Sequence, residues 1–112
     1  MDLTEKGCAP CEGGVPGLGR DRVGELLHEV PGWQVSGDNR TLSKEFRFSH
    51  FAGTMVFVSQ MAALAEEQGH HPDFCVHYDR LDIQLTTHAI RGLSENDFIM
   101  AAKLNQLASV TK

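Results

Sequence analysis

Two short segments in the second half of the chain alternate apolar and polar residues and are joined by a very short link. The apolar positions are Phe74, Val76 and Tyr78 in the first segment and Leu81, Ile83 and Leu85 in the second. Alternation with a period of two is typical of a β-strand that buries one face. The tight link at Asp79-Arg80 therefore predicts an antiparallel hairpin, although it lacks the Asn-Gly type of turn signature.

Two more strands are predicted upstream of this hairpin. Residues 41–48 alternate in the same way, with Lys44 as the exception on a side otherwise formed by Leu42, Phe46 and Phe48. Residues 33–36 form a shorter candidate strand, and Gly37-Asp38-Asn39 is a typical turn between the two.

Three segments have helical spacing instead. Val23, Leu26, Leu27 and Val30 fall on one face of a short helix, which Pro31-Gly32 ends. A long helix is predicted from a Ser49 cap to about Gln68, with Gly69 as its C-terminal stop. The capping-box pattern Ser94-Glu95-Asn96-Asp97 opens a last helix that runs to about Leu107.

The long helix carries two apolar stripes, although one stripe is enough to cover a sheet. The first consists of Phe51, Met55, Val58, Ala62 and Ala65, and the second of Phe57, Met61 and Leu64. A domain this small has difficulty burying a helix on all sides, so we expect the second stripe to bind another subunit. The sequence thus predicts a homo-oligomer.

The predicted order of elements is αββαββα. This order indicates an α+β fold in which a four-stranded antiparallel sheet has three helices packed on one face. A length of 112 residues allows one domain, which we expect to span residues 19–112. Residues 1–18 are rich in glycine and proline and are predicted to form a disordered leader.

Charge and composition exclude several classes of partner. The formal net charge is −5 and Lys and Arg form no run of three, so we expect neither a nucleic-acid partner nor binding to an anionic membrane surface. No apolar stretch has the length of a membrane span, and Met1–Lys6 lacks a signal-peptide core. The expected location is therefore cytoplasmic, with reduced cysteines. Cys8 and Cys11 form a CxxC, which we interpret as incidental thiols rather than as a metal or redox site.

Three of the six histidines form a suggestive group. His70 and His71 follow the long helix and precede Pro72, which favours an extended backbone at His71 and makes the two adjacent imidazoles diverge. His88 is expected to end the fourth strand on its polar side, in one row with Thr86. Histidines at such positions are often only hydrogen-bonded boundary residues, but a cluster of three favours a functional site.

Two carboxylates and a possible metal site complete the candidates. Glu66 lies in the last turn of the long helix, where the helix dipole disfavours a negative charge by roughly 0.3–1 kcal/mol. Because this position is unfavourable for a carboxylate and lies one turn before the histidine pair, we keep Glu66 as a candidate for binding a polar heterocycle. Asp97 is explained equally well as a capping residue and as a carboxylate that orients a histidine. Metal catalysis is a rival interpretation, but the diverging His70 and His71 lack the spacing of a ligand pair, and no metal site is predicted.

These residues together resemble the pterin-4a-carbinolamine dehydratase family over about residues 20–108. The resemblance rests on Glu66, His70-His71-Pro72, Asp73-Phe74, Tyr78, Thr87-His88, Gly92-Leu93-Ser94 and Asp97, with Pro31-Gly32-Trp33 upstream. It implies a four-stranded antiparallel sheet backed by three helices, assembly into dimers or tetramers, and a pterin bound near the histidine pair.

The resemblance also implies roles for individual residues. His70, His71 and His88 correspond to the family's essential histidines, while Glu66, Trp33 and Asp97 correspond to supporting residues. Pro72, Thr86 and Thr87 belong to the same candidate site. The chain departs from the pattern at Gly69, where some members have an acid, and at Phe74, where some have Trp.

The implied reaction is the dehydration of 4a-hydroxytetrahydropterin to quinonoid dihydropterin and water, which supports recycling of a tetrahydrobiopterin-type cofactor. Histidine acid–base catalysis suits this reaction, and it requires no nicotinamide, flavin or metal cofactor. One alternative is a non-catalytic role as the dimerisation cofactor of a transcription factor. Another is an enzyme that acts on a different pterin, for example in molybdopterin metabolism.

Overall fold

The computed structural model describes residues 2–9 and 16–111, and in these ranges the strands form one antiparallel sheet. The strands are β1 (Gln34–Val35), β2 (Leu42–Arg47), β3 (Asp73–His77) and β4 (Arg80–Leu85), in the spatial order β1-β2-β4-β3. The predicted hairpin is confirmed, since β3 pairs with β4 in antiparallel register. Its turn consists of Tyr78 and Asp79, and Tyr78 has a positive φ of 55°.

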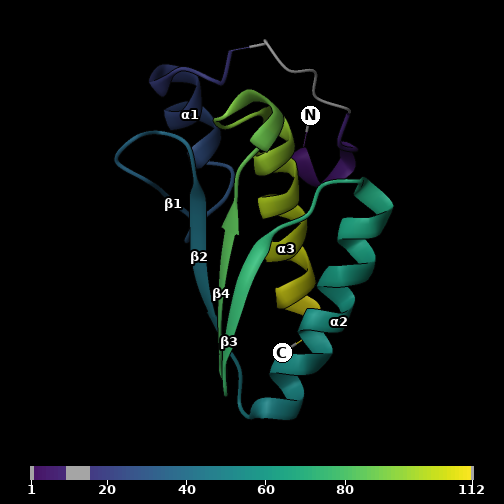
Figure 1. The fold of residues 1–112 in the computed structure, drawn as a ribbon. Helices are drawn as coiled ribbons and strands as arrows, with labels where there is room; N and C mark the ends of the chain where they lie inside the picture. Colours follow the sequence, from purple (N-terminus) through teal and green to yellow (C-terminus); the bar gives the residue numbers. More distant parts are fainter. Residues whose placement is uncertain (1, 10–15, 112) are drawn as a thin grey trace.

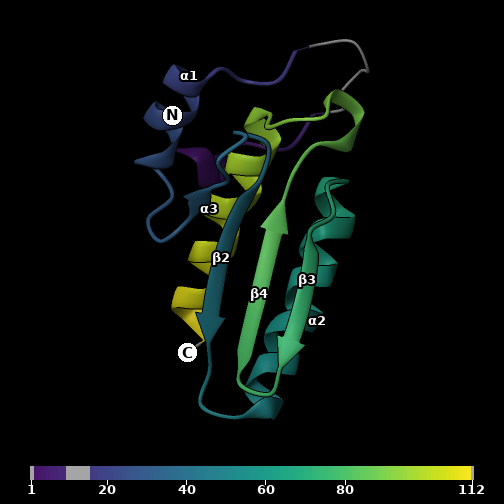
Figure 2. The ribbon, with the colours of Figure 1, turned by 60° about the vertical axis from the view of Figure 1, so that its left-hand side comes forward.

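The helices occupy the predicted places between the strands. They are α1 (Arg20–Leu27), α2 (Phe51–Gln68) and α3 (Glu95–Thr111), with short 3-10 helices η1 (Leu3–Glu5) and η2 (His88–Ile90). The order α1 β1 β2 α2 β3 β4 α3 confirms the predicted α+β fold. Figure 1 shows α2 and α3 side by side and running in opposite directions, and Figure 2 shows the sheet in front of them. None of the helices in the described ranges is long and apolar enough to cross a bilayer.

The core lies between the sheet and the helices. The alternation of β2 and β4 sends Leu42, Phe46, Leu81, Ile83 and Leu85 inward, where they are at most 3% exposed. The helices cover this face with one joint cluster of buried side chains, among them Val23 and Leu26 of α1, Phe57 of α2 and Phe98 of α3. Polar side chains such as Glu45 and Gln84 lie on the opposite, solvent-facing side of the sheet.

The assignment of the two α2 stripes was wrong. Phe57 and Met61, which were expected to face a partner, are 0% and 1% exposed within this chain. The Phe57 ring stacks on the Phe46 ring at 5.3 Å between centroids, so it belongs to the core. The exposed apolar residues of α2 are Phe51, Met55 and Val56, at 48%, 39% and 52%. The buried side of α2 takes Phe57 and Met61 from the second stripe and Ala65 from the first, so packing against the rest of the fold decides which residues turn inward.

The start of α2 also differs from the prediction. His50 rather than Ser49 is the N-cap, and its Nδ1 accepts a hydrogen bond of 3.0 Å from the backbone N–H of Gly53. An imidazole nitrogen can satisfy an unpaired amide at a helix start as a hydroxyl does. The end of α2 is as predicted, because Gly69 takes the left-handed conformation with φ 66°.

The predicted disordered leader differs from the structure in residues 2–9. Leu3 is only 4% exposed and joins the core. The Lys103 ammonium donates to the carbonyl of Thr4 at 2.9 Å, and Lys6 forms an ion pair with Glu95 at 2.7 Å. A buried leucine, two lysine contacts and hydrogen bonds from Cys8 and Ala9 thus fix a segment whose composition is typical of disorder. Cys11 lies outside the described residues, and with it the interpretation of the CxxC.

Candidate active site

The candidate site lies at the end of the sheet where α2 and β4 end and α3 begins, at the upper end of the molecule in Figure 1. The left-handed Gly69 ends α2 and turns the chain, so that His70 and His71 follow in the connection to β3. The chain after β4 passes through Thr86 and Thr87 into η2, which begins at His88. Two separate connections thus carry the histidines to the same end of the sheet.

The contact between His70 and Asp97 joins a predicted histidine of this site to a fully buried carboxylate. Nε2 of His70 lies 2.7 Å from Oδ1 of Asp97, and their side chains are 12% and 0% exposed. The other carboxylate oxygen, Oδ2, accepts hydrogen bonds from the Thr87 hydroxyl at 2.8 Å and from the Ser94 backbone N–H at 3.0 Å. Asp97 therefore fills both roles that the sequence left open, since it caps α3 and contacts a histidine.

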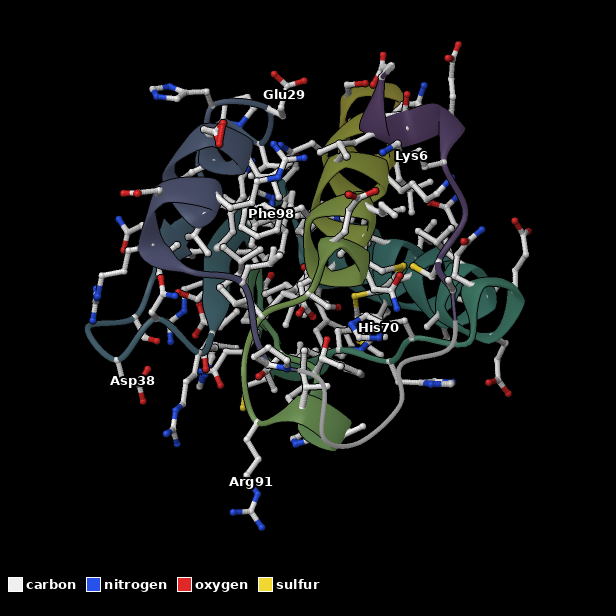
Figure 3. The ribbon with its side chains drawn as sticks, turned by 90° about the horizontal axis from the view of Figure 1, so that it is seen from above. Lys6, Glu29, Asp38, His70, Arg91 and Phe98 are labelled. Carbon is white, nitrogen blue, oxygen red and sulfur yellow. The ribbon has the colours of Figure 1, made fainter. Side chains whose placement is uncertain are left out.

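This arrangement fixes which nitrogen of His70 is available for chemistry. A carboxylate only accepts hydrogen bonds, so with Asp97 in that form Nε2 of His70 donates and Nδ1 of the neutral ring remains an acceptor. A buried carboxylate that holds one tautomer of an imidazole is a recurring device in acid–base catalysis. Figure 3 views this end from above and shows His70 beside α3.

The other two predicted histidines are far more exposed. Nε2 of His71 lies 2.6 Å from Oε2 of Glu66, with side-chain exposures of 61% and 79%. An ion pair this exposed contributes little stability, although it restricts the direction of the imidazole. His88 begins η2 instead of ending the fourth strand, because β4 stops at Leu85. Its Nε2 lies 4.0 Å from Oδ2 of Asp73.

A cavity of about 480 Å³ brings five of the predicted residues together. Its wall includes His70, His71, Thr86, Thr87 and His88. This volume lies in the range of typical small-molecule sites, and a bicyclic heterocycle fits within it. The cavity is therefore a candidate binding site with histidine nitrogens on its wall.

Four predicted site residues do not line this cavity. Asp97 lies behind its wall, in contact with His70 and Thr87. Glu66 reaches the site only through His71, and Pro72 forms part of the connection to β3. Trp33 lies in the core at 4% exposure, where its indole N–H donates to Oδ1 of Asn105 at 3.0 Å. Its ring packs edge-on against Phe46, so Trp33 supports the fold rather than the cavity.

Sequence reasoning missed six residues of the cavity wall. Gly69 and Ala89 are immediate neighbours of predicted histidines, and the other four are Cys8, Ala9, Gln68 and Asn96. Asn96 was visible only as an interior position of the capping box, and Cys8 and Ala9 had been assigned to the leader. No local pattern marks these residues, because the contacts that bring them to the site span 60 to 88 positions of sequence.

Within residues 2–9 and 16–111, no three His, Cys, Asp or Glu side chains are grouped so that they could hold a metal ion. The donors of this site instead form pairs, His70 with Asp97 and His71 with Glu66.

Comparison with known proteins decides the family. The sequence model described as pterin 4 alpha carbinolamine dehydratase matches residues 16–107. The chain belongs to this family. A provisionally named pterin-4-alpha-carbinolamine dehydratase of Rubrobacter xylanophilus is 45% identical over 106 residues, which cover 95% of this chain and 98% of that relative. A relative from Nitrosospira multiformis with the same provisional name is 43% identical over 97% of this chain and 95% of its own.

Two solved structures have a similar fold. The crystal structure of a transcriptional coactivator/pterin dehydratase from Brucella melitensis is 34% identical, with a TM-score of 0.79 over 82% of this chain and 98% of that one. A pterin dehydratase-like protein described as a RuBisCO assembly factor in the alpha-carboxysome is 31% identical. Its TM-score is 0.60, over 69% of this chain and 89% of its own. Family membership supports pterin-dehydratase activity in general terms.

Proposed function

We propose that this protein dehydrates 4a-hydroxytetrahydropterin to quinonoid dihydropterin, with the substrate bound in the cavity beside His70. The observation that carries the proposal is the contact of His70, on the wall of a cavity of about 480 Å³, with the fully buried carboxylate of Asp97. Family membership supports the same class of reaction.

The reaction needs two proton transfers and no change of oxidation state. The C4a–O bond breaks, its electron pair leaves with the oxygen, and a proton delivered to that oxygen lets it depart as water. The proton on N5 is lost, and the electrons of the N5–H bond form the C4a=N5 double bond. Histidine side chains can both deliver and accept protons near neutral pH, and a positioned acid–base group typically contributes about 10²–10⁴-fold.

His70 is assigned to one of these transfers because Asp97 holds its ring and leaves Nδ1 as the acceptor. His88 is assigned to the other, since it lies on the wall of the same cavity and its exposed imidazole is free to adjust to the substrate. His71 positions the substrate or relays a proton, with Glu66 restricting its orientation. In this assignment Thr87 acts indirectly, by holding Asp97.

The physiological role that follows is the recycling of a tetrahydrobiopterin-type cofactor. Its substrate is the carbinolamine that pterin-dependent hydroxylation leaves behind, and the solvent-accessible cavity would accept it as a free small molecule. The enzyme would be a 4a-hydroxytetrahydrobiopterin dehydratase in the class of hydro-lyases.

A role in binding another protein is the second candidate. The Brucella melitensis structure is named as a transcriptional coactivator as well as a pterin dehydratase, and this chain exposes apolar residues of α2 at Phe51, Met55 and Val56. A protein with only a binding role would not need the His70–Asp97 contact. Replacing His70 would then leave its function unchanged.

The test is the rate at which freshly formed 4a-hydroxytetrahydropterin disappears with and without the purified protein. We expect a clear acceleration over the spontaneous reaction at catalytic protein concentrations. A decay that is identical in both samples would contradict the proposal.

A further inference from the structure

The segment at residues 6–9, which we call the N-terminal strap, crosses the candidate site outside the part of the chain that the family model matches. That model begins at residue 16, whereas Cys8 and Ala9 lie on the wall of the cavity together with His70 and His88. The family model therefore does not include the strap, and the role of the strap rests on the contacts that it makes in this structure.

Hydrogen bonds hold the strap on both sides of the site. The backbone of Ala9 is paired twice with the Asn96 side chain, because its N–H donates to Oδ1 at 2.9 Å and its carbonyl accepts from Nδ2 at 2.5 Å. The backbone N–H of Cys8 donates to Oε1 of Gln68 at 2.9 Å. Further back, the Lys6–Glu95 ion pair at 2.7 Å ties the strap to the first turn of α3.

The anchors of the strap are close neighbours of the catalytic pair in sequence. Asn96 immediately precedes Asp97 at the start of α3, and Gln68 ends α2 two residues before His70. The strap thus bridges the two elements that bring His70 and Asp97 together. It occupies a fixed position relative to them and does not hang freely over the cavity.

The side chains on the cavity wall of the strap are small. The backbone amides of Cys8 and Ala9 are used by Gln68 and Asn96, and the Cys8 thiol lies 3.7 Å from the carbonyl of Asn96. The side chain of Ala9, a residue of this wall, is a single methyl group. A larger side chain at either position would occupy space that the ligand needs. Ala9 is the better position to test, because its residue is exposed and a substitution there does not disturb the core.

We infer that the strap is a wall of the pterin site and that Ala9 limits the size of the ligand that enters it. This inference rests on the proposed function, because it takes the cavity beside His70 to be the pterin site. It adds a specificity-determining residue that lies outside the residues 16–107 matched by the family model.

The test uses the full-length protein and 7,8-dihydrobiopterin, a pterin that lacks the 4a-hydroxyl group and cannot be dehydrated. Its dissociation constant is measured by calorimetry for the wild type, Ala9→Gly, Ala9→Leu and Ala9→Phe. Binding should weaken as the side chain grows, with Ala9→Phe weaker by about tenfold or more, since filling a defined space is costly. The matched control is Glu5→Phe, which adds the same ring at the end of η1, next to the strap and away from the cavity, and should change the affinity by less than about twofold.

The outcomes separate this inference from the proposed function. A folded Ala9→Phe protein that binds dihydrobiopterin with wild-type affinity would overturn the role of the strap. If Ala9→Phe does not fold, wild-type affinity in Ala9→Leu would overturn it instead. Size-dependent binding in a protein that does not accelerate dehydration would support the strap and contradict the proposed reaction. A wild type that binds no dihydrobiopterin would overturn both.

Discussion

Nε2 of His70 lies 2.7 Å from Oδ1 of Asp97, although 27 positions separate the two residues in the sequence. Asp97 also accepts from Thr87 and from the backbone of Ser94, so its position is fixed before a ligand binds. A catalytic group whose orientation is set in advance needs no reorganisation during the reaction. The predictions below start from this contact.

The first prediction concerns Asp97. Replacing Asp97 with Asn keeps the size of the side chain, but it presents an amide in place of a carboxylate and removes the group that selects one tautomer of His70. We expect kcat to fall by about 100-fold or more, as for a lost acid–base group. Steady-state kinetics together with thermal unfolding provide the measurement. A folded Asp97→Asn protein with wild-type kcat would show that the carboxylate does not support catalysis.

The second prediction concerns the difference between the histidines. His88→Ala should lower the dehydration rate by about 100-fold or more, because His88 lies on the cavity wall. His77→Ala is the matched control, since His77 is exposed in β3 and its nearest charged partner is Asp82 at 3.6 Å. Its turnover should stay near that of the wild type. If both variants lower the dehydration rate by the same small factor, His88 has no catalytic role.

The third prediction concerns the two faces of α2. Phe57→Ala should lower the free energy of unfolding by about 3–5 kcal/mol, because the ring is fully buried and stacked on Phe46. Phe51→Ala on the same helix removes a ring that is 48% exposed and should cost much less. Chemical denaturation of both variants is the measurement. Similar losses for both would contradict the inward orientation of Phe57.

The fourth prediction concerns assembly. A homodimer or homotetramer remains our expectation, and the apolar face available for it is formed by Phe51, Met55 and Val56. Val56→Glu should dissociate the oligomer, because the new charge would be buried without a partner at the interface. The fold should remain intact, because residue 56 is exposed in the single chain. Met61→Glu should instead prevent folding, since Met61 is in the core. Light scattering of a folded wild-type monomer at micromolar concentration would contradict the assembly.

The fifth prediction concerns metal. Proton transfer by histidines predicts that protein stripped of metal by a chelator retains full dehydratase activity. Activity is measured before and after chelation, with individual divalent ions added back. Loss on chelation and recovery with one specific ion would contradict the proton-transfer account.

The sequence predicted the fold well because its strongest signals are local. The hairpin at residues 73–85 and the Gly69 helix stop each depend on neighbouring residues, and both are confirmed. The orientation of α2 was not predictable in the same way. Both of its stripes are apolar, and the contact that turns Phe57 inward, with the ring of Phe46, is a tertiary contact.

The site was predictable as a set of residues, but its internal contacts were not. His70 and Asp97 were both candidates, and the capping pattern placed Asp97 correctly at the start of α3. Trp33 was included through its resemblance to a family position, yet its indole serves the core. Cys8 was noted only as half of a CxxC and Ala9 not at all, because their positions at the site depend on side chains of Gln68 and Asn96 far along the chain.

The most direct test of the proposed reaction compares the wild type with His70→Gln in one assay. A glutamine amide can still donate to Asp97 but cannot transfer a proton in the manner of an imidazole, so the contact is retained while the chemistry is removed. The quantity measured is the initial rate of 4a-hydroxytetrahydropterin dehydration, corrected for the spontaneous reaction. We expect acceleration by the wild type and a rate about 100-fold lower or more for a folded His70→Gln protein. Equal acceleration by the two proteins would contradict the assignment of His70 as the proton-transfer group.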